Sequence, residues 1–217
     1  MGFNFRNCVG VSCIVLFWGS IAAAGIADRD IRRITVLVHD SAQVAPSVLN
    51  GAEIETARIF RAAGVEIEWI RCSNRSAIVE DECHVIPGSN QFVLHIVPTG
   101  ETSSDLVFGI AFLGADGSGK YCDVFYDHIA EAHHESGVNL SLLLGMVAAH
   151  ELGHLLLGSH AHSYMGIMTP VWRGEVLRRM DMGSLLFTSE QASAMRARIR
   201  GREMGRVSVG ATDEKEN

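Results

Sequence analysis

The most constraining feature of this 217-residue chain is an apolar segment, Asn139–Leu157, which contains the sequence HELGH at 150–154 near its end. The segment is long enough for about five helical turns. Gly158, a residue type that commonly ends helices, follows it. Residues four apart share one face of a helix, so His150 and His154 direct two imidazoles toward one point. The segment therefore predicts an apolar helix with two potential metal ligands near its end.

Two imidazole nitrogens at this spacing suit Zn²⁺, which prefers tetrahedral nitrogen, sulfur and oxygen ligands. Glu151 follows the first histidine and can reach a water on the metal without being a ligand itself. A bound zinc lowers the pKa of its water to about 7, and a carboxylate beside it can accept the proton as the water attacks a carbonyl. The motif predicts one catalytic zinc ion, with His150 and His154 as ligands and Glu151 as general base.

The rest of the chain alternates short β-branched runs with helical stretches, which predicts an α+β fold. A helix is predicted from Pro46 to the residue before Gly64, and the capping box TSEQ at 188–191 opens a last helix that runs through Arg200. The polar segment 131–137 is expected to be a loop. Five strands are predicted, over Ile34–Val38, Val65–Cys72, Gln91–Val97, Phe108–Leu113 and Tyr121–Ile129.

The sequence HELGHLLLGSHAHSYMGIMTP at 150–170 resembles the metzincin superfamily of zinc peptidases, nearest the matrixins, whose pattern HExxHxxGxxH precedes a methionine turn. The order of the predicted elements is also similar to that of the matrixin catalytic domain. The resemblance implies a twisted, mixed five-stranded sheet, two long helices including the zinc-binding helix, a Met-turn and a C-terminal helix. Met168 would then form an apolar floor under the zinc. Substrate would bind along an edge strand that contains Gly109, Ile110, Ala111 and Phe112.

Two histidines are candidates for the third zinc ligand. The matrixin spacing counted from His154 favours His160. Leu157 stands where the family pattern has its glycine, and Gly158 comes one residue later. The helix is therefore expected to run one residue longer, and the later return of the chain favours His162 as the ligand. His162 also precedes a serine, a pair that is common at the matrixin third ligand. We favour His162 and keep His160 as the alternative; binding by both would close the water position and argue against catalysis.

Three other residues near the motif have two interpretations each. Tyr164 either donates a hydrogen bond to an oxyanion, as in some zinc peptidases, or forms part of the cleft wall. His133 and His134 either line the cleft or lie in a solvated loop, and we favour the loop.

Residues 1–24 have the layout of a secretory signal, with Arg6 near the start, an apolar middle and three alanines at the end. Cleavage is expected after Ala24, with Ala27 as the alternative site. An uncleaved membrane anchor is the other interpretation, which the short apolar stretch disfavours. The protein is therefore expected to be secreted or periplasmic.

Three domain segments follow from this assignment: the signal peptide at 1–24, a metzincin-like zinc peptidase domain at 25–205 and a flexible acidic tail at 206–217. Removal of the signal takes away one arginine and makes the formal charge more negative than the −7 of the full chain. This acidic balance argues against a nucleic-acid partner. No membrane partner is expected after signal cleavage, and the oligomeric state is not predicted.

The cysteine pattern agrees with export. Cys8 and Cys13 leave with the signal, while Cys72 and Cys83 flank a polar loop and are the expected disulfide pair in an oxidising compartment. Cys122 lies in an apolar run and is expected to be a buried small hydrophobe.

These features together predict a secreted zinc metalloendopeptidase that acts on a peptide or protein substrate. One alternative is a metzincin-fold protein that keeps the zinc for structure or binding and has no peptidase activity. The intact Glu151 argues against it, since a structural site does not need that carboxylate. A zinc hydrolase that acts on a non-peptide amide is the other alternative.

Overall fold

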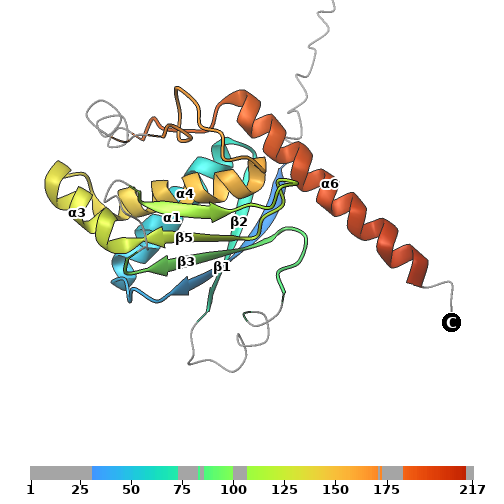
Figure 1. Cartoon of the computed structure of the whole chain (residues 1–217), viewed down its shortest axis with the longest axis horizontal. Coiled ribbons are helices and arrows are strands. Elements are labelled where there is room, and N and C mark those ends of the chain that lie inside the picture. The colour runs from blue at the N-terminus through green and yellow to red at the C-terminus, as the bar shows by residue number, and fades with distance from the viewer. Residues whose placement is uncertain are drawn as a thin grey trace, which may run out of the picture.

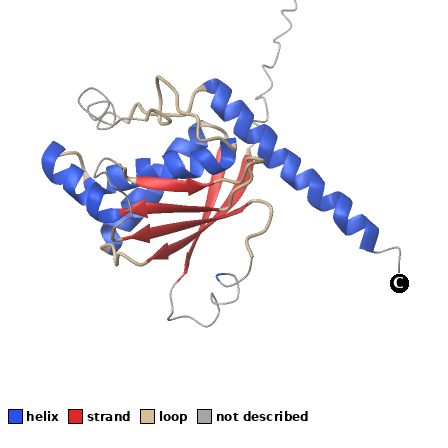
Figure 2. Ribbon diagram, viewed as in Figure 1, coloured by secondary structure: helices blue, strands red, loops and turns tan. Residues whose placement is uncertain are grey.

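The computed structural model describes residues 31–72, 83, 86–99, 107–170, 172 and 183–213, with side chains of the last helix up to Met204. The predicted signal segment lies outside the described residues. Figures 1 and 2 show one sheet with helices packed on it and a long C-terminal helix. The strands are β1 (Arg32–Asp40), β2 (Val65–Cys72), β3 (Gln91–Val97), β4 (Gly109–Phe112) and β5 (Tyr121–Phe125). The helices are α1 (Pro46–Ala62), α3 (Tyr126–Ser136), α4 (Leu140–Leu157) and α6 (Ser189–Asp213).

The five strands form one sheet in the order β2-β1-β3-β5-β4. The first four strands of this order run parallel, and β4 pairs with β5 in the antiparallel direction. This mixed sheet, with four helices in the described part of the chain, confirms the predicted α+β class. Because β4 is the last strand of the sheet, one of its backbone edges pairs with no other strand of that sheet.

Helices α1 and α4 pack on one face of the sheet (Figure 1). Alternate residues of β1 and β3 turn toward these helices and join their side chains in one core, namely Ile34, Val36, Val38, Phe92, Leu94 and Ile96. Helix α4 is apolar on all sides, and every residue from Leu143 to Leu156 is buried. A helix of this kind belongs in the centre of a fold. It is long and apolar enough to span a membrane, but 78% of it is buried inside the protein.

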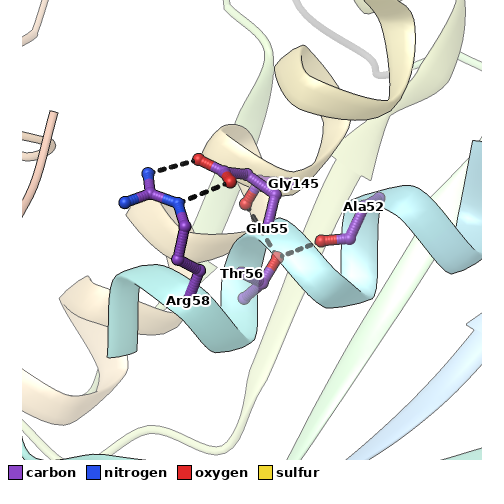
Figure 3. A network of polar contacts seen from close by, with 5 residues as sticks. All are labelled: Ala52, Glu55, Thr56, Arg58 and Gly145. Atoms are coloured by element: carbon purple, nitrogen blue, oxygen red, sulfur yellow. Dashed lines mark hydrogen bonds and ion pairs between the residues drawn. The ribbon is translucent and has the colours of Figure 1, made fainter. Parts of the chain in front are cut away.

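Helices α1 and α4 cross closely because Gly145 has no side chain. A Cβ at this position would lie 2.6 Å from the carbonyl oxygen of Ala52. The hydroxyl of Thr56 lies 2.8 Å from the Gly145 carbonyl oxygen and 2.9 Å from the Ala52 carbonyl oxygen (Figure 3). These two carbonyls satisfy the buried hydroxyl. Arg58 donates two hydrogen bonds to the carboxylate of Glu55 beside the crossing (Figure 3). The crossing therefore combines a close backbone approach with local polar contacts.

Arginines of α6 bind the ends of the two core helices. Arg196 Nη1 donates to the Ala63 carbonyl just after α1, at 2.6 Å. Arg202 Nη2 donates to the Leu155 carbonyl in the last turn of α4, at 3.3 Å. Positive charge is favourable at helix C-termini, so these contacts fix the first part of α6 against the body. The remainder of α6 projects away from it (Figure 1).

The region after β5 differs from the prediction. We expected a strand up to Ile129 and then a polar loop, but β5 ends at Phe125 and helix α3 follows at once. The register explains the early end, because Phe125 pairs with Val97, the last residue of β3. The backbone N–H of Asp127 instead donates to the carbonyl of Pro98, at 2.9 Å. Strand length here depends on the partner strand, which local sequence does not encode.

The last helix begins as predicted and ends later than predicted. Thr188 N donates to Gln191 Oε1 at 2.9 Å, and Gln191 N donates to Thr188 Oγ1 at 3.2 Å, which is the expected capping box. The helix then continues to Asp213, beyond the domain boundary that we predicted at 205. The flexible acidic tail stays a prediction.

The three cysteines among the described residues lie as the sequence predicts. Cys72 and Cys83 form a disulfide with their Cα atoms 5.7 Å apart. Cys122 is fully buried, and burial raises the pKa of its thiol well above the usual value. A disulfide of this kind is compatible with an exported protein.

The helix crossing generates a stability prediction. We expect Gly145→Ala to lower the free energy of unfolding by about 1–3 kcal/mol, because the new methyl group would overlap the Ala52 carbonyl. Gly201→Ala in α6 is the matched control, since a Cβ there meets nothing within 4 Å. It should raise the free energy by about 0.5–1 kcal/mol through helix propensity. Urea unfolding followed by circular dichroism measures both; equal effects at the two positions would contradict the close crossing.

Candidate metal centre

Helix α4 brings three polar side chains into the apolar core. His150, Glu151 and His154 are 8%, 6% and 4% exposed. The segment that follows α4 returns His162 to the same place. The Nε2 atom of His150 lies 3.1 Å from that of His154 and 3.3 Å from that of His162. The three histidines therefore form one cluster whose ligand atoms all lie within 4.8 Å of one another.

Backbone carbonyls orient the two helical imidazoles. His150 Nδ1 lies 2.8 Å from the carbonyl oxygen of Ile167, and His154 Nδ1 lies 2.7 Å from that of Ser159. A carbonyl only accepts, so each Nδ1 is the protonated donor and each Nε2 keeps its lone pair. Ligating histidines in metal sites use this arrangement. The Nε2 lone pairs consequently face the centre of the cluster.

The cluster favours neutral imidazoles, which are the form that binds a metal. Burial lowers the pKa of His150 to about 3. Burial also lowers the pKa values of His154 and His162, and the neighbouring His160 lowers both further. Three neutral Nε2 atoms whose lone pairs converge on one point fit Zn²⁺. In catalytic sites this ion binds three protein ligands and keeps a fourth position open for water or substrate.

Glu151 is buried beside the cluster and against the edge strand. Burial raises the pKa of its carboxyl to about 8. A Cβ on Gly109 would lie 2.8 Å from Glu151 Cγ and 2.7 Å from the carbonyl oxygen of Asp123. Gly109 is therefore needed for strand β4 to lie directly against this carboxylate. The sequence suggested Gly109 only as part of the edge strand, so this role was missed.

A cleft of about 250 Å³ lies between strand β4 and the histidine cluster. Three of the four predicted edge-strand residues, Gly109, Ile110 and Ala111, line it. Phe112 does not line it and is exposed on the protein surface. The other lining residues are Val107, Phe108, Val147, His150, Glu151, His154, His160, His162, Thr169, Pro170 and Trp172.

Met168 is fully buried in a turn beside α4. A Cβ on Gly153 would lie 2.8 Å from Met168 Sδ, so this glycine of the HELGH sequence admits the methionine close to the helix. Gly166 has φ +80°, a conformation that favours glycine, and allows the chain to turn there. The backbone N–H of Ser163 donates to the Met168 carbonyl at 2.9 Å and closes the turn.

The two candidates for the third ligand lie in different places. The rings of His162 and His154 have centroids 5.0 Å apart, and His162 belongs to the cluster. His160 lines the cleft, but its ring centroid lies 6.0 Å from that of His154 and it is not in the cluster.

Tyr164 is fully exposed and does not line the cleft, so neither interpretation of it fits this structure.

His133 and His134 lie in helix α3, not in the expected loop, and neither lines the cleft.

Sequence reasoning missed Trp172, whose indole meets the His150 ring edge-on, with ring centroids 5.5 Å apart. Its Nε1 donates to the Thr169 carbonyl at 2.8 Å. No local pattern around residue 172 signals this contact, because it depends on how the chain returns to the helix.

No protein-family model matches this chain, and no curated protein matches it. Among solved structures, the chain is similar to a zinc-dependent peptidase from Methanocorpusculum labreanum (strain Z), with 15% sequence identity and a TM-score of 0.48. The match covers 74% of this chain and 99% of that one. At this level the similarity establishes neither a shared fold nor a shared function, so the capability of the site follows from its own geometry.

The cluster geometry predicts different effects for the two candidate ligands. We expect one equivalent of zinc to bind and His162→Ala to weaken its affinity by more than about 100-fold, since loss of a supporting partner alone costs 10–100-fold. His160→Ala, two residues away, is the matched control and should keep the affinity. Calorimetric titration against a competing chelator measures both. Loss of zinc in His160→Ala with retention in His162→Ala would contradict the cluster.

Burial of Glu151 predicts a pH-dependent stability difference in the metal-free protein. Between pH 4.5 and about 8 the folded carboxyl keeps a proton that the unfolded chain releases, so the stability of the wild type falls as pH rises. The side chain of Glu151→Gln does not titrate. The free energy of unfolding of this variant minus that of the wild type should therefore increase across this window and level off above it. Urea unfolding with a chelator at both ends of the window measures this. The exposed Glu131→Gln controls for the lost charge, and a pH-independent difference would be evidence against burial of the carboxylate.

Proposed function

We propose that this protein is an exported zinc-dependent endopeptidase of the metzincin type. The observation that carries the proposal is the combination of three converging Nε2 atoms with the buried Glu151 in one cleft beside a sheet edge. A structural zinc site needs the three nitrogens and a fourth ligand. It needs neither a cleft nor a carboxylate that is not a ligand.

His150, His154 and His162 would hold the zinc through Nε2. When bound, zinc would polarise the substrate carbonyl and acidify the attacking water. Glu151 accepts the proton of that water as its oxygen bonds to the carbonyl carbon, and then gives the proton to the amine as the C–N bond breaks. Burial raises the pKa of this carboxyl in the metal-free protein, and the positive charge of a bound zinc would lower it and favour the carboxylate that accepts the proton.

Substrate would lie along β4, the edge strand of the sheet. The edge of β4 that pairs with no described strand can pair with an extended peptide, a common mode of peptide recognition. Gly109, Ile110 and Ala111 line the cleft, so a peptide paired there runs past Glu151. The apolar lining by Phe108, Val147 and Trp172 excludes water from part of the site.

Further parts of the proposal derive from the sequence. Residues 1–24 would direct export as a cleaved signal, which the Cys72–Cys83 disulfide suits. Met168 would form the apolar floor of the centre, as in metzincins, and its position against Gly153 supports this role.

The proposal predicts that Glu151→Gln separates zinc binding from catalysis. The variant should keep one zinc, because the carboxylate is not a ligand, and lose at least about 100-fold in the cleavage rate of an unstructured protein. Zinc content by atomic spectroscopy and cleavage by mass spectrometry measure the two effects, with the exposed Glu131→Gln as control. Removal of zinc by a chelator should abolish cleavage and its return should restore it. Zinc binding by an inert wild type would instead favour the structural or binding protein.

A further inference from the structure

We propose that His160 is a further catalytic residue, which donates a ring N–H hydrogen bond to the carbonyl oxygen of the scissile peptide. The inference rests on the proposed peptidase function and deepens it. As the water oxygen bonds to the carbonyl carbon, the π electron pair moves onto the carbonyl oxygen, and Glu151 takes the proton of the water. His160 stabilises the resulting negative charge without transferring a proton.

The polar groups that line the cleft lead to this assignment. Apart from the three clustered histidines, the lining side chains with polar atoms in the described chain are Glu151, His160, Thr169 and the indole of Trp172. Thr169 Oγ1 donates to the Gly166 carbonyl at 2.8 Å, and Trp172 Nε1 donates to the Thr169 carbonyl. Glu151 is the proton acceptor of the reaction. His160 is left as the side chain that can offer a donor to a substrate.

The loop after α4 holds His160 at the cleft. The Ser159 carbonyl accepts the Nδ1 hydrogen of His154 at 2.7 Å, which ties the residue before His160 to the helix. Ser159 Oγ accepts from the Ala161 backbone N–H at 3.0 Å, which orders the residue after it. The imidazole of His160 is exposed and lies beside the ring of His154, with centroids 6.0 Å apart. It is therefore close to the zinc position and accessible to a substrate.

A donor at this place addresses the largest energetic need of the reaction. Hydrogen bonds aimed at a developing oxyanion are strongest in the transition state, and loss of one such donor costs about 100- to 1,000-fold in kcat. Tyr164, which the sequence suggested for this role, is exposed away from the cleft lining. His160 would thus fill the role that was one of the two interpretations of Tyr164.

The test compares His160→Ala and His160→Gln with the wild type, and uses Tyr164→Phe as a control outside the cleft. We expect His160→Ala to retain one zinc with unchanged affinity and to lose about 100- to 1,000-fold in kcat with a small change in KM. His160→Gln keeps an N–H donor and should recover part of the loss, while Tyr164→Phe should match the wild type. Calorimetry with a phosphinic peptide, which mimics the tetrahedral intermediate, should show a parallel loss of affinity in His160→Ala.

Each other result has one meaning. Unchanged kcat and phosphinic-peptide affinity in His160→Ala, beside an active wild type, overturn the role of His160 alone. Loss of zinc in His160→Ala shows that this residue is a ligand and also overturns it. A rise in KM alone assigns His160 to substrate binding, against the proposal. A zinc-loaded wild type that cleaves no peptide overturns the peptidase function and this inference with it.

Discussion

The burial of polar groups on an apolar helix is the constraint on which this structure depends. Helix α4 lies in the core on all sides, yet it carries two imidazoles and a carboxylate. A buried polar group without a partner costs about 1–3 kcal/mol. The carbonyls of Ile167 and Ser159 meet this need for the two histidines, and both belong to the segment that follows the helix. The same two hydrogen bonds fold that segment back onto α4 and turn both Nε2 atoms toward one centre, so core packing and site geometry have one origin.

Three glycines let the surroundings of α4 come close enough to fix this geometry. Gly145 admits the backbone of α1, Gly153 admits Met168 and Phe187, and Gly109 admits the Glu151 side chain against β4. In each place an added Cβ would come within 2.8 Å of a neighbouring atom. The contacts belong to helix, turn and strand, and together they hold the helix on different sides. A site supported in this way by rigid elements is preorganised, since its side chains have little room to move.

Local patterns predicted the parts of the molecule that depend on local geometry. The i, i+4 spacing placed His150 and His154 on one helical face, and the Thr188–Gln191 capping box marked the start of α6. The prediction was wrong where distant chain segments decide. β5 ends at Phe125 because its partner strand ends, and the next residues form α3 despite a largely polar sequence. Trp172 could not be predicted at His150, because that contact depends on the return of the chain after the turn.

The position of the third clustered histidine shows why residue counting alone left two candidates. The family spacing counts from the second histidine, but a ligand can return only after the helix has ended. Here α4 ends at Leu157 and Gly158 caps it with φ +64°, and the next carbonyl, on Ser159, accepts a hydrogen bond from His154. The chain is thus held against the helix at residue 159 and reverses over the following residues. His162 stacks beside the His150 ring at an interplanar angle of 28°, while His160 lines the cleft outside the cluster. The later return of the chain places His162 in the cluster and leaves the imidazole of His160 at the cleft.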